Sequence, residues 1–103
     1  MSIPFTQYHL PNGRRTTESY DPGSPAIQAL ADKIIAVGGR FEAEILRTGQ
    51  VSLTVAAPLP DPTTPGETFD GDIAIIICRN ELGFLNRAIE SLVAQAAKKL
   101  GIK

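Results

Sequence analysis

The apolar residues change their spacing at Gly38-Gly39, and this change limits what the chain can fold into. Before it, hydrophobic residues recur every three or four positions, which is the spacing of one helical face. After it, apolar and polar residues alternate, which is the spacing of a half-buried strand. A helix and strands of this kind bury their apolar sides against one another. The spacing therefore predicts one α+β domain over residues 1–103.

The first helix is expected over residues 24–38. Its apolar stripe consists of Ile27, Leu30, Ala31, Ile34 and Ile35. Ser24 is placed as the N-cap, and Pro25 follows at the first helical position, where a missing N–H costs nothing. Gly38-Gly39 supplies the left-handed residue that ends many helices.

Strand signals lie on both sides of this helix. Residues 1–20 predict a hairpin, because an aromatic and β-branched run precedes the turn-forming pair Asn12-Gly13. Residues 40–56 predict a second hairpin, since both of its arms alternate apolar and polar side chains. Residues 73–78 are apolar at every position, which is typical of a strand covered on both faces.

Two further segments complete the chain. Residues 57–72 contain four prolines and two glycines, a composition that predicts a long mobile loop. Residues 82–100 predict an amphipathic helix that ends at Gly101. The apolar stripe of this helix consists of Leu85, Ile89, Leu92, Val93, Ala96 and Leu100.

The order ββαβββα predicts an antiparallel sheet of three to five strands with two helices packed on one face. On strand 73–78, the face away from the helices is expected to carry Ala74, Ile76 and Cys78. This apolar face needs a cover. We expect residues 3–10 to pair with or pack against strand 73–78, with a homodimer contact as the alternative.

Composition excludes several classes of function. The 103 residues carry ten Lys and Arg against eleven Asp and Glu, a formal charge of −1, which disfavours phosphate binding unless the cations cluster. One cysteine and no signal-like start disfavour secretion. The longest apolar run has six residues, far below the roughly 20 that span a bilayer. We expect a cytoplasmic protein with no membrane contact.

The sequence offers no group of residues suited to catalysis. His9 is the only histidine and Cys78 the only cysteine, so neither has partners at metal-ligand spacing. No phosphate loop, nucleophile elbow or dinucleotide fingerprint occurs. We expect no enzyme activity, cofactor or metal. The four residues Arg14, Arg15, Arg40 and Arg47 are candidate contacts if the fold brings them together.

Two parts of the chain resemble small uncharacterised proteins of bacteriophages and prophages. The segments are IPFTQY at residues 3–8 with PNGRR at 11–15, and RFEAEIL at 40–46 with TGQVSLT at 48–54. That family has no assigned activity. The resemblance implies a phage or prophage origin and assigns no role to any residue.

The leading interpretation is a non-catalytic phage or prophage accessory protein that binds another protein, which includes modulation of a host factor. The alternatives are a small nucleic-acid-binding module and a subunit of a larger enzyme assembly. The chain itself is expected to be a monomer or a homodimer. The candidate partner contacts are Arg14, Arg15, Arg40, Arg47, Ala74, Ile76 and Cys78.

Overall fold

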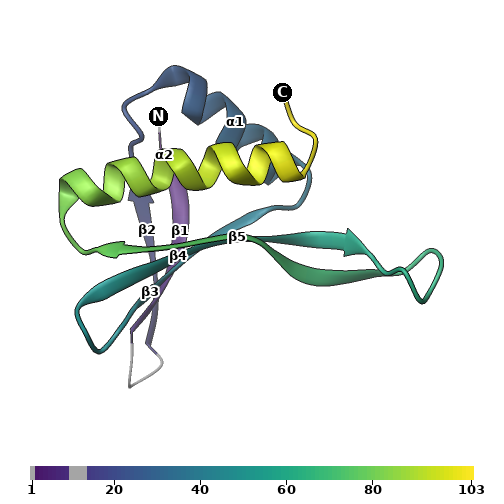
Figure 1. Cartoon of the computed structure of the whole chain (residues 1–103), viewed down its shortest axis with the longest axis horizontal. Helices are drawn as coiled ribbons and strands as arrows, with labels where there is room; N and C mark the ends of the chain where they lie inside the picture. Colours follow the sequence, from purple (N-terminus) through teal and green to yellow (C-terminus); the bar gives the residue numbers. More distant parts are fainter. Residues whose placement is uncertain (1, 10–13) are drawn as a thin grey trace.

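The computed structural model describes residues 2–9 and 14–103, and it confirms the α+β fold and the order ββαβββα (Figure 1). The elements are β1 (Ile3–His9), β2 (Arg14–Tyr20), α1 (Pro25–Ala36), β3 (Arg40–Ile45), β4 (Gln50–Pro60), β5 (Thr68–Arg79) and α2 (Leu82–Lys99). The five strands form one sheet, and both helices lie on the same face of it. The N-terminal hairpin is confirmed, whereas its expected Asn12-Gly13 turn lies outside the described residues.

The sheet has the strand order β2-β1-β3-β4-β5 and is mixed rather than wholly antiparallel. The exception is the β1–β3 pair, which is parallel, with Phe5 opposite Phe41. Strand β2 ends with Tyr20 beside Ile3 at the start of β1. After α1 the chain enters β3 at this same end, so β3 runs in the direction of β1.

The first strand lies far from the segment that we expected it to cover. Strands β3 and β4 separate β1 from β5, so the expected pairing of residues 3–10 with residues 73–78 is wrong. The ring of the fully buried Phe5 packs against Phe41 at 5.3 Å between centroids and edge-on against Tyr20 at 4.9 Å. These aromatic contacts fix β1 beside β3 and β2.

Both helices begin and end close to the expected residues. The Ser24 Oγ accepts a hydrogen bond from the backbone N–H of Ile27 at 3.4 Å, which caps α1 as expected. Gly38 has φ +92°, the left-handed conformation that ends a helix. Helix α2 packs its apolar stripe over β4 and β5, and α1 packs beside α2 and over β1 (Figure 1).

The proline-rich segment is a two-stranded arm, so the expected loop over residues 57–72 is wrong. The β4–β5 ladder continues through Leu59 opposite Phe69 to Pro60 opposite Thr68, and only the connection between them is a turn. Proline is tolerated here because β3 begins at Arg40, opposite Ala56, and does not extend along the rest of β4. From Ala57 onward, β5 is the only described strand that pairs with β4. Pro58 and Pro60 have no N–H group, but no third strand is present there to accept a hydrogen bond from one. The arm projects from the body along the longest extent of the molecule, which is 41 Å (Figure 1).

Candidate functional site

The two faces of β5 are the reverse of those expected. Ala74 is buried, and Ile76 and Cys78 pack against the core, so these three expected partner contacts face the helices. Ile75 and Ile77 are 54% and 57% exposed and lie on the other face. A strand that is apolar on both sides contains no alternation from which its buried face can be read.

A β-bulge decides which residues of β5 face outward. Val55 pairs with Ala74 but the next residue, Ala56, pairs with Asp72, so Ile73 is the extra residue in β5. Ile73 and Ala74 are both buried, and Asp72 is exposed. The Nζ of Lys99 in α2 donates a hydrogen bond to the Ile73 carbonyl oxygen at 2.8 Å. The bulge therefore aligns Asp72 with Ile75 and Ile77 on the outer face.

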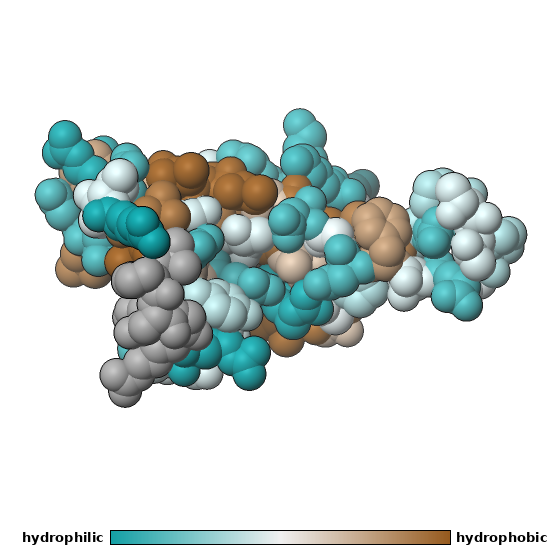
Figure 2. Space-filling model, turned by 90° about the horizontal axis from the view of Figure 1, so that it is seen from below, coloured by the Kyte–Doolittle hydropathy of each residue, from teal (hydrophilic) through white to brown (hydrophobic). Residues whose placement is uncertain are grey.

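The outer face of the sheet is the side away from both helices, and its centre is polar (Figure 2). Two rows of paired positions cross it from β1 to β5. The rows are Thr6, Glu42, Thr54 and Ile75, and Tyr8, Glu44, Ser52 and Ile77. In Figure 2 hydrophobic residues gather along one margin of this face, over β5. The apolar part of the face is therefore a border rather than a central patch.

Exposed hydrophobic residues concentrate along and beside β5. Among the described residues, seven large hydrophobic side chains are exposed, and five of them lie in β5 or in the first turn of α2. We call these five the β5 border. They are Phe69, Ile75, Ile77, Leu82 and Phe84. Because β5 is also a terminal strand of the sheet, the border combines apolar side chains with free backbone groups.

Opposite charges flank the two isoleucines of the β5 border. Asp70 and Asp72 precede its isoleucines, and Arg79 follows them. Asp70 is engaged by Arg40, whose Nη2 lies 2.5 Å from an Asp70 carboxylate oxygen. In the part of the chain that the structure describes, neither Asp72 nor Arg79 forms an ion pair. The Arg79 guanidinium lies over the Phe84 ring, 5.3 Å from its centroid.

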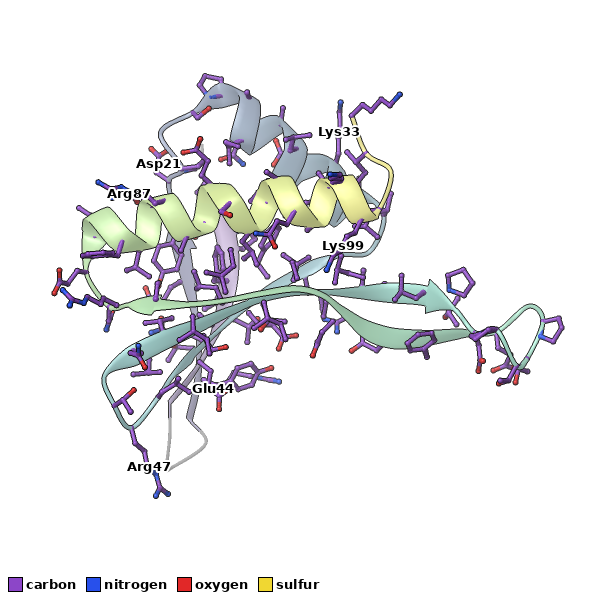
Figure 3. The ribbon with its side chains drawn as sticks, in the orientation of Figure 1. Asp21, Lys33, Glu44, Arg47, Arg87 and Lys99 are labelled. Atoms are coloured by element: carbon purple, nitrogen blue, oxygen red, sulfur yellow. The ribbon has the colours of Figure 1, made fainter. Side chains whose placement is uncertain are left out.

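The four candidate arginines lie at two opposite ends of β3. Arg40 begins β3, whereas Arg47 follows the other end of the strand, at the margin of the molecule shown in Figure 3. Arg14 and Arg15 begin β2 next to that second end, because His9 pairs with both Arg14 and Ile45. The side chain of Arg14 lies outside the described part. The fold therefore separates Arg40 from the other three.

The surroundings of Arg40 also oppose polyanion binding. The hydrogen bond that the Arg40 guanidinium donates to the Asp70 carboxylate raises the pKa of Arg40, and a Glu42 carboxylate oxygen lies 3.8 Å from the Arg40 Nε. Glu42 and Glu44 add two negative charges to the outer face, and Glu44 projects away from the helices (Figure 3). These carboxylates repel phosphate groups over the middle of the sheet.

Cys78 lies near the end of β5 and packs against the core. Burial raises the pKa of the Cys78 thiol, which keeps it in the weakly nucleophilic neutral form. Within residues 2–9 and 14–103, no three His, Cys, Asp or Glu side chains gather as metal ligands. A hollow of about 130 Å³ lies at the start of α2, lined by Glu81, Gly83, Phe84 and Arg87.

Comparison with known proteins gives no match, whether with family models, curated proteins or solved structures. Neither helix in the described residues has the length and apolar character needed to cross a membrane.

The sequence predicts the wrong outward face for β5. It named Ala74, Ile76 and Cys78 and missed Ile75 and Ile77. The sequence does contain one signal of a strand that can pair with an antiparallel copy of itself: the apolar run 73–78 is preceded by the negative Asp72 and followed by the positive Arg79.

Proposed function

We propose that this chain is a non-catalytic accessory protein of phage or prophage type that binds another protein through the β5 border. The observation that carries the proposal is the concentration of exposed hydrophobic side chains along a terminal strand of the sheet. Scattered exposed hydrophobic residues are normal, whereas neighbouring ones on one face of a terminal strand mark an interaction surface, and Ile75 and Ile77 are such neighbours.

A terminal strand with apolar side chains suits a protein partner more than a nucleic acid. Its free N–H and C=O groups pair with an added strand, while Ile75 and Ile77 give that strand an apolar neighbour. Nucleic acid binding needs clustered cations, and the fold separates Arg40 from Arg47. Protein binding is therefore the function that this geometry supports best.

Affinity capture from a bacterial lysate, with variants of matched exposure, tests the proposal. The test variant is Ile75→Lys with Ile77→Lys, which places two charges on the β5 border. The control is Val37→Lys, because Val37 is 56% exposed but follows α1, away from β5. We expect the wild type and the control to retain a protein that the double variant loses. Equal capture by all three proteins contradicts the proposal, as does the absence of any captured protein together with the absence of association between copies of the chain.

A further inference from the structure

We propose that the β5 border binds a second copy of this chain, through antiparallel pairing of the two β5 strands about a two-fold axis at Ile76. This inference rests on the proposed function, since it names the partner of the same border. It joins the two five-stranded sheets into one continuous sheet. A two-fold contact of this kind is isologous, so each feature of β5 must find its complement on the same strand.

The pleat of the strand limits the registers that such a pair can use. An axis perpendicular to the sheet keeps both outer faces on one side, so paired residues must come from the same face of the strand. Pairing about Ile76 sets Ile75 opposite Ile77 of the second copy, and the reverse. The four isoleucines then form one apolar cluster on the outer face, which covers the side chains that are more than half exposed in the single chain.

The charges at the ends of the strand match in the same register. Pairing about Ile76 sets Arg79 opposite the bulge of the second copy, where Asp72 and not Ile73 carries the outward side chain. Each dimer then gains two Arg79–Asp72 contacts, one at each end of the cluster. Both groups lack an ion-pair partner among the described residues of the single chain, so the contact displaces no existing pair.

Neighbouring registers lose this complementarity. Pairing about Ile77 sets the Arg79 side chain opposite Ile75. The charged guanidinium then has an apolar partner in place of a carboxylate. Pairing about Ile75 leaves a single Ile75–Ile75 contact on the outer face, because Ile73 is turned into the core by the bulge. The register about Ile76 is the one in which apolar and charged positions both match.

The ends of the β5 border extend the contact beyond the paired strands. Specific interfaces bury roughly 800 Å² on each partner, which is more than a few paired strand residues supply. Antiparallel pairing brings Phe69, before the isoleucines of one copy, to the level of Leu82 and Phe84 of the other. The hollow at the start of α2 lies at the same end and is lined in part by Gly83. A Cβ added to Gly83 would meet no atom within 4 Å, so the surface there is open.

Charge reversal tests the proposed register in the full chain. Arg79→Asp alone sets two aspartates opposite each other at both ends of the dimer, and Asp72→Arg alone does the same with arginines. Mixing the two single variants restores an Asp–Arg contact at each end, as does the double variant that carries both substitutions. Both residues are exposed and neither forms an ion pair in the described structure, and the contact that Arg79→Asp removes, with the Phe84 ring, lies at the surface. The single chain therefore keeps its fold in each variant, which circular dichroism checks.

The measurement is the mass in solution by sedimentation equilibrium between about 1 and 200 µM. We expect wild-type protein at twice the chain mass of 11.0 kDa, and dimer dissociation constants at least about tenfold higher for each single variant. The mixture and the double variant should return to dimers. Wild-type protein that stays monomeric would overturn the dimer. Single variants that dimerise as tightly as wild type would overturn the register about Ile76. If the wild type is a monomer and captures a protein that the Ile75→Lys, Ile77→Lys variant loses, the dimer is excluded but the proposed function is retained.

Discussion

Gly39 stands where any side chain would collide with the end of α1. A Cβ at this position would contact the Ile34 Cγ2 and lie 2.7 Å from the Ile34 carbonyl oxygen. Ile34 is fully buried and cannot move away without disturbing the core. We expect Gly39→Ala to lower the free energy of unfolding by about 1–3 kcal/mol, measured by urea denaturation.

Gly83 gives a matched glycine control for this substitution. It lies in the first turn of α2, and an added Cβ would meet no atom within 4 Å. Gly83→Ala should leave the free energy of unfolding unchanged or raise it by up to about 1 kcal/mol, because alanine favours the helix. Equal losses for the two variants would show that close contact with Ile34 is not the cause.

The carboxylate of Asp61 organises the turn at the tip of the arm. Its Oδ1 accepts hydrogen bonds from the Thr63 hydroxyl at 2.7 Å and from the Thr63 backbone N–H at 2.9 Å. These bonds favour the charged form and hold the pKa of Asp61 below its ordinary value of 3.8. Their stabilisation is therefore present above about pH 4 and is lost as the pH falls through the lowered pKa.

Removal of the Thr63 hydroxyl should raise the pKa of Asp61. We expect Thr63→Ala to move it toward 3.8, because the side-chain hydrogen bond is the larger cause of the shift. A carboxyl titration by NMR measures the value directly, and Thr64→Ala serves as the control. A pKa that stays equally low in Thr63→Ala would assign the shift to the backbone N–H alone.

At the scale of elements, one lysine links α2 to the bulge of β5. The bulge leaves the Ile73 carbonyl outside the regular ladder, and the Lys99 Nζ donates to it at 2.8 Å (Figure 3). Lys99→Met leaves this partly buried carbonyl without its donor, and we expect a loss of about 1–3 kcal/mol in the free energy of unfolding. Lys98→Met is the control. A thermal or urea transition measures both variants, and similar stability would mean that water replaces the lysine.

Regular periodicity made most elements predictable. The three- and four-residue spacing of Ile27, Ala31 and Ile34 gave α1, and the alternation from Val51 to Val55 gave the first part of β4. Each of these elements is buried on one side only, so the spacing of its apolar residues indicates which side faces the core. The same reasoning placed α2 to within one residue of its end.

Features that depend on a neighbouring strand were not predictable. Proline predicts a loop over residues 57–72, but β3 begins opposite Ala56 and leaves the rest of β4 without a third strand, which makes Pro58 and Pro60 compatible with a strand. Likewise, the parallel pairing of β1 with β3 depends on where α1 returns the chain. Local sequence does not specify these relationships.

The candidate site was missed for a related reason. An all-apolar strand reads the same on both faces, and only the bulge at Ile73 decides that Ile75 and Ile77 point outward. The number and positions of the arginines do not reveal their partners. Arg40 donates a hydrogen bond to Asp70, which lies thirty positions further along the chain. The identity of the strand was accessible from sequence, but its exposed face was not.

The whole molecule consists of a packed body and a projecting arm. The hydrophobic core is formed by the helices and by the sheet up to Leu59, which packs against it. The stretch beyond, Pro60 to Thr68, is exposed except for the half-buried Asp61, and contributes no residue to the core. The outer part of the arm, residues 60–68, therefore adds length to the molecule without adding to the packing that stabilises it.

Shortening the arm tests this division. Residues 60–68 can be replaced by Asn-Gly, because Leu59 and Phe69 are directly paired and this dipeptide forms two-residue hairpin turns. We expect cooperative unfolding with a free energy within about 1 kcal/mol of wild type, since a shorter connection slightly lowers the cost of closing the hairpin. Urea denaturation followed by near-ultraviolet circular dichroism measures both stability and tertiary packing. A loss of the cooperative transition would show that the arm is part of the folding unit, because the substitution leaves every core residue in place.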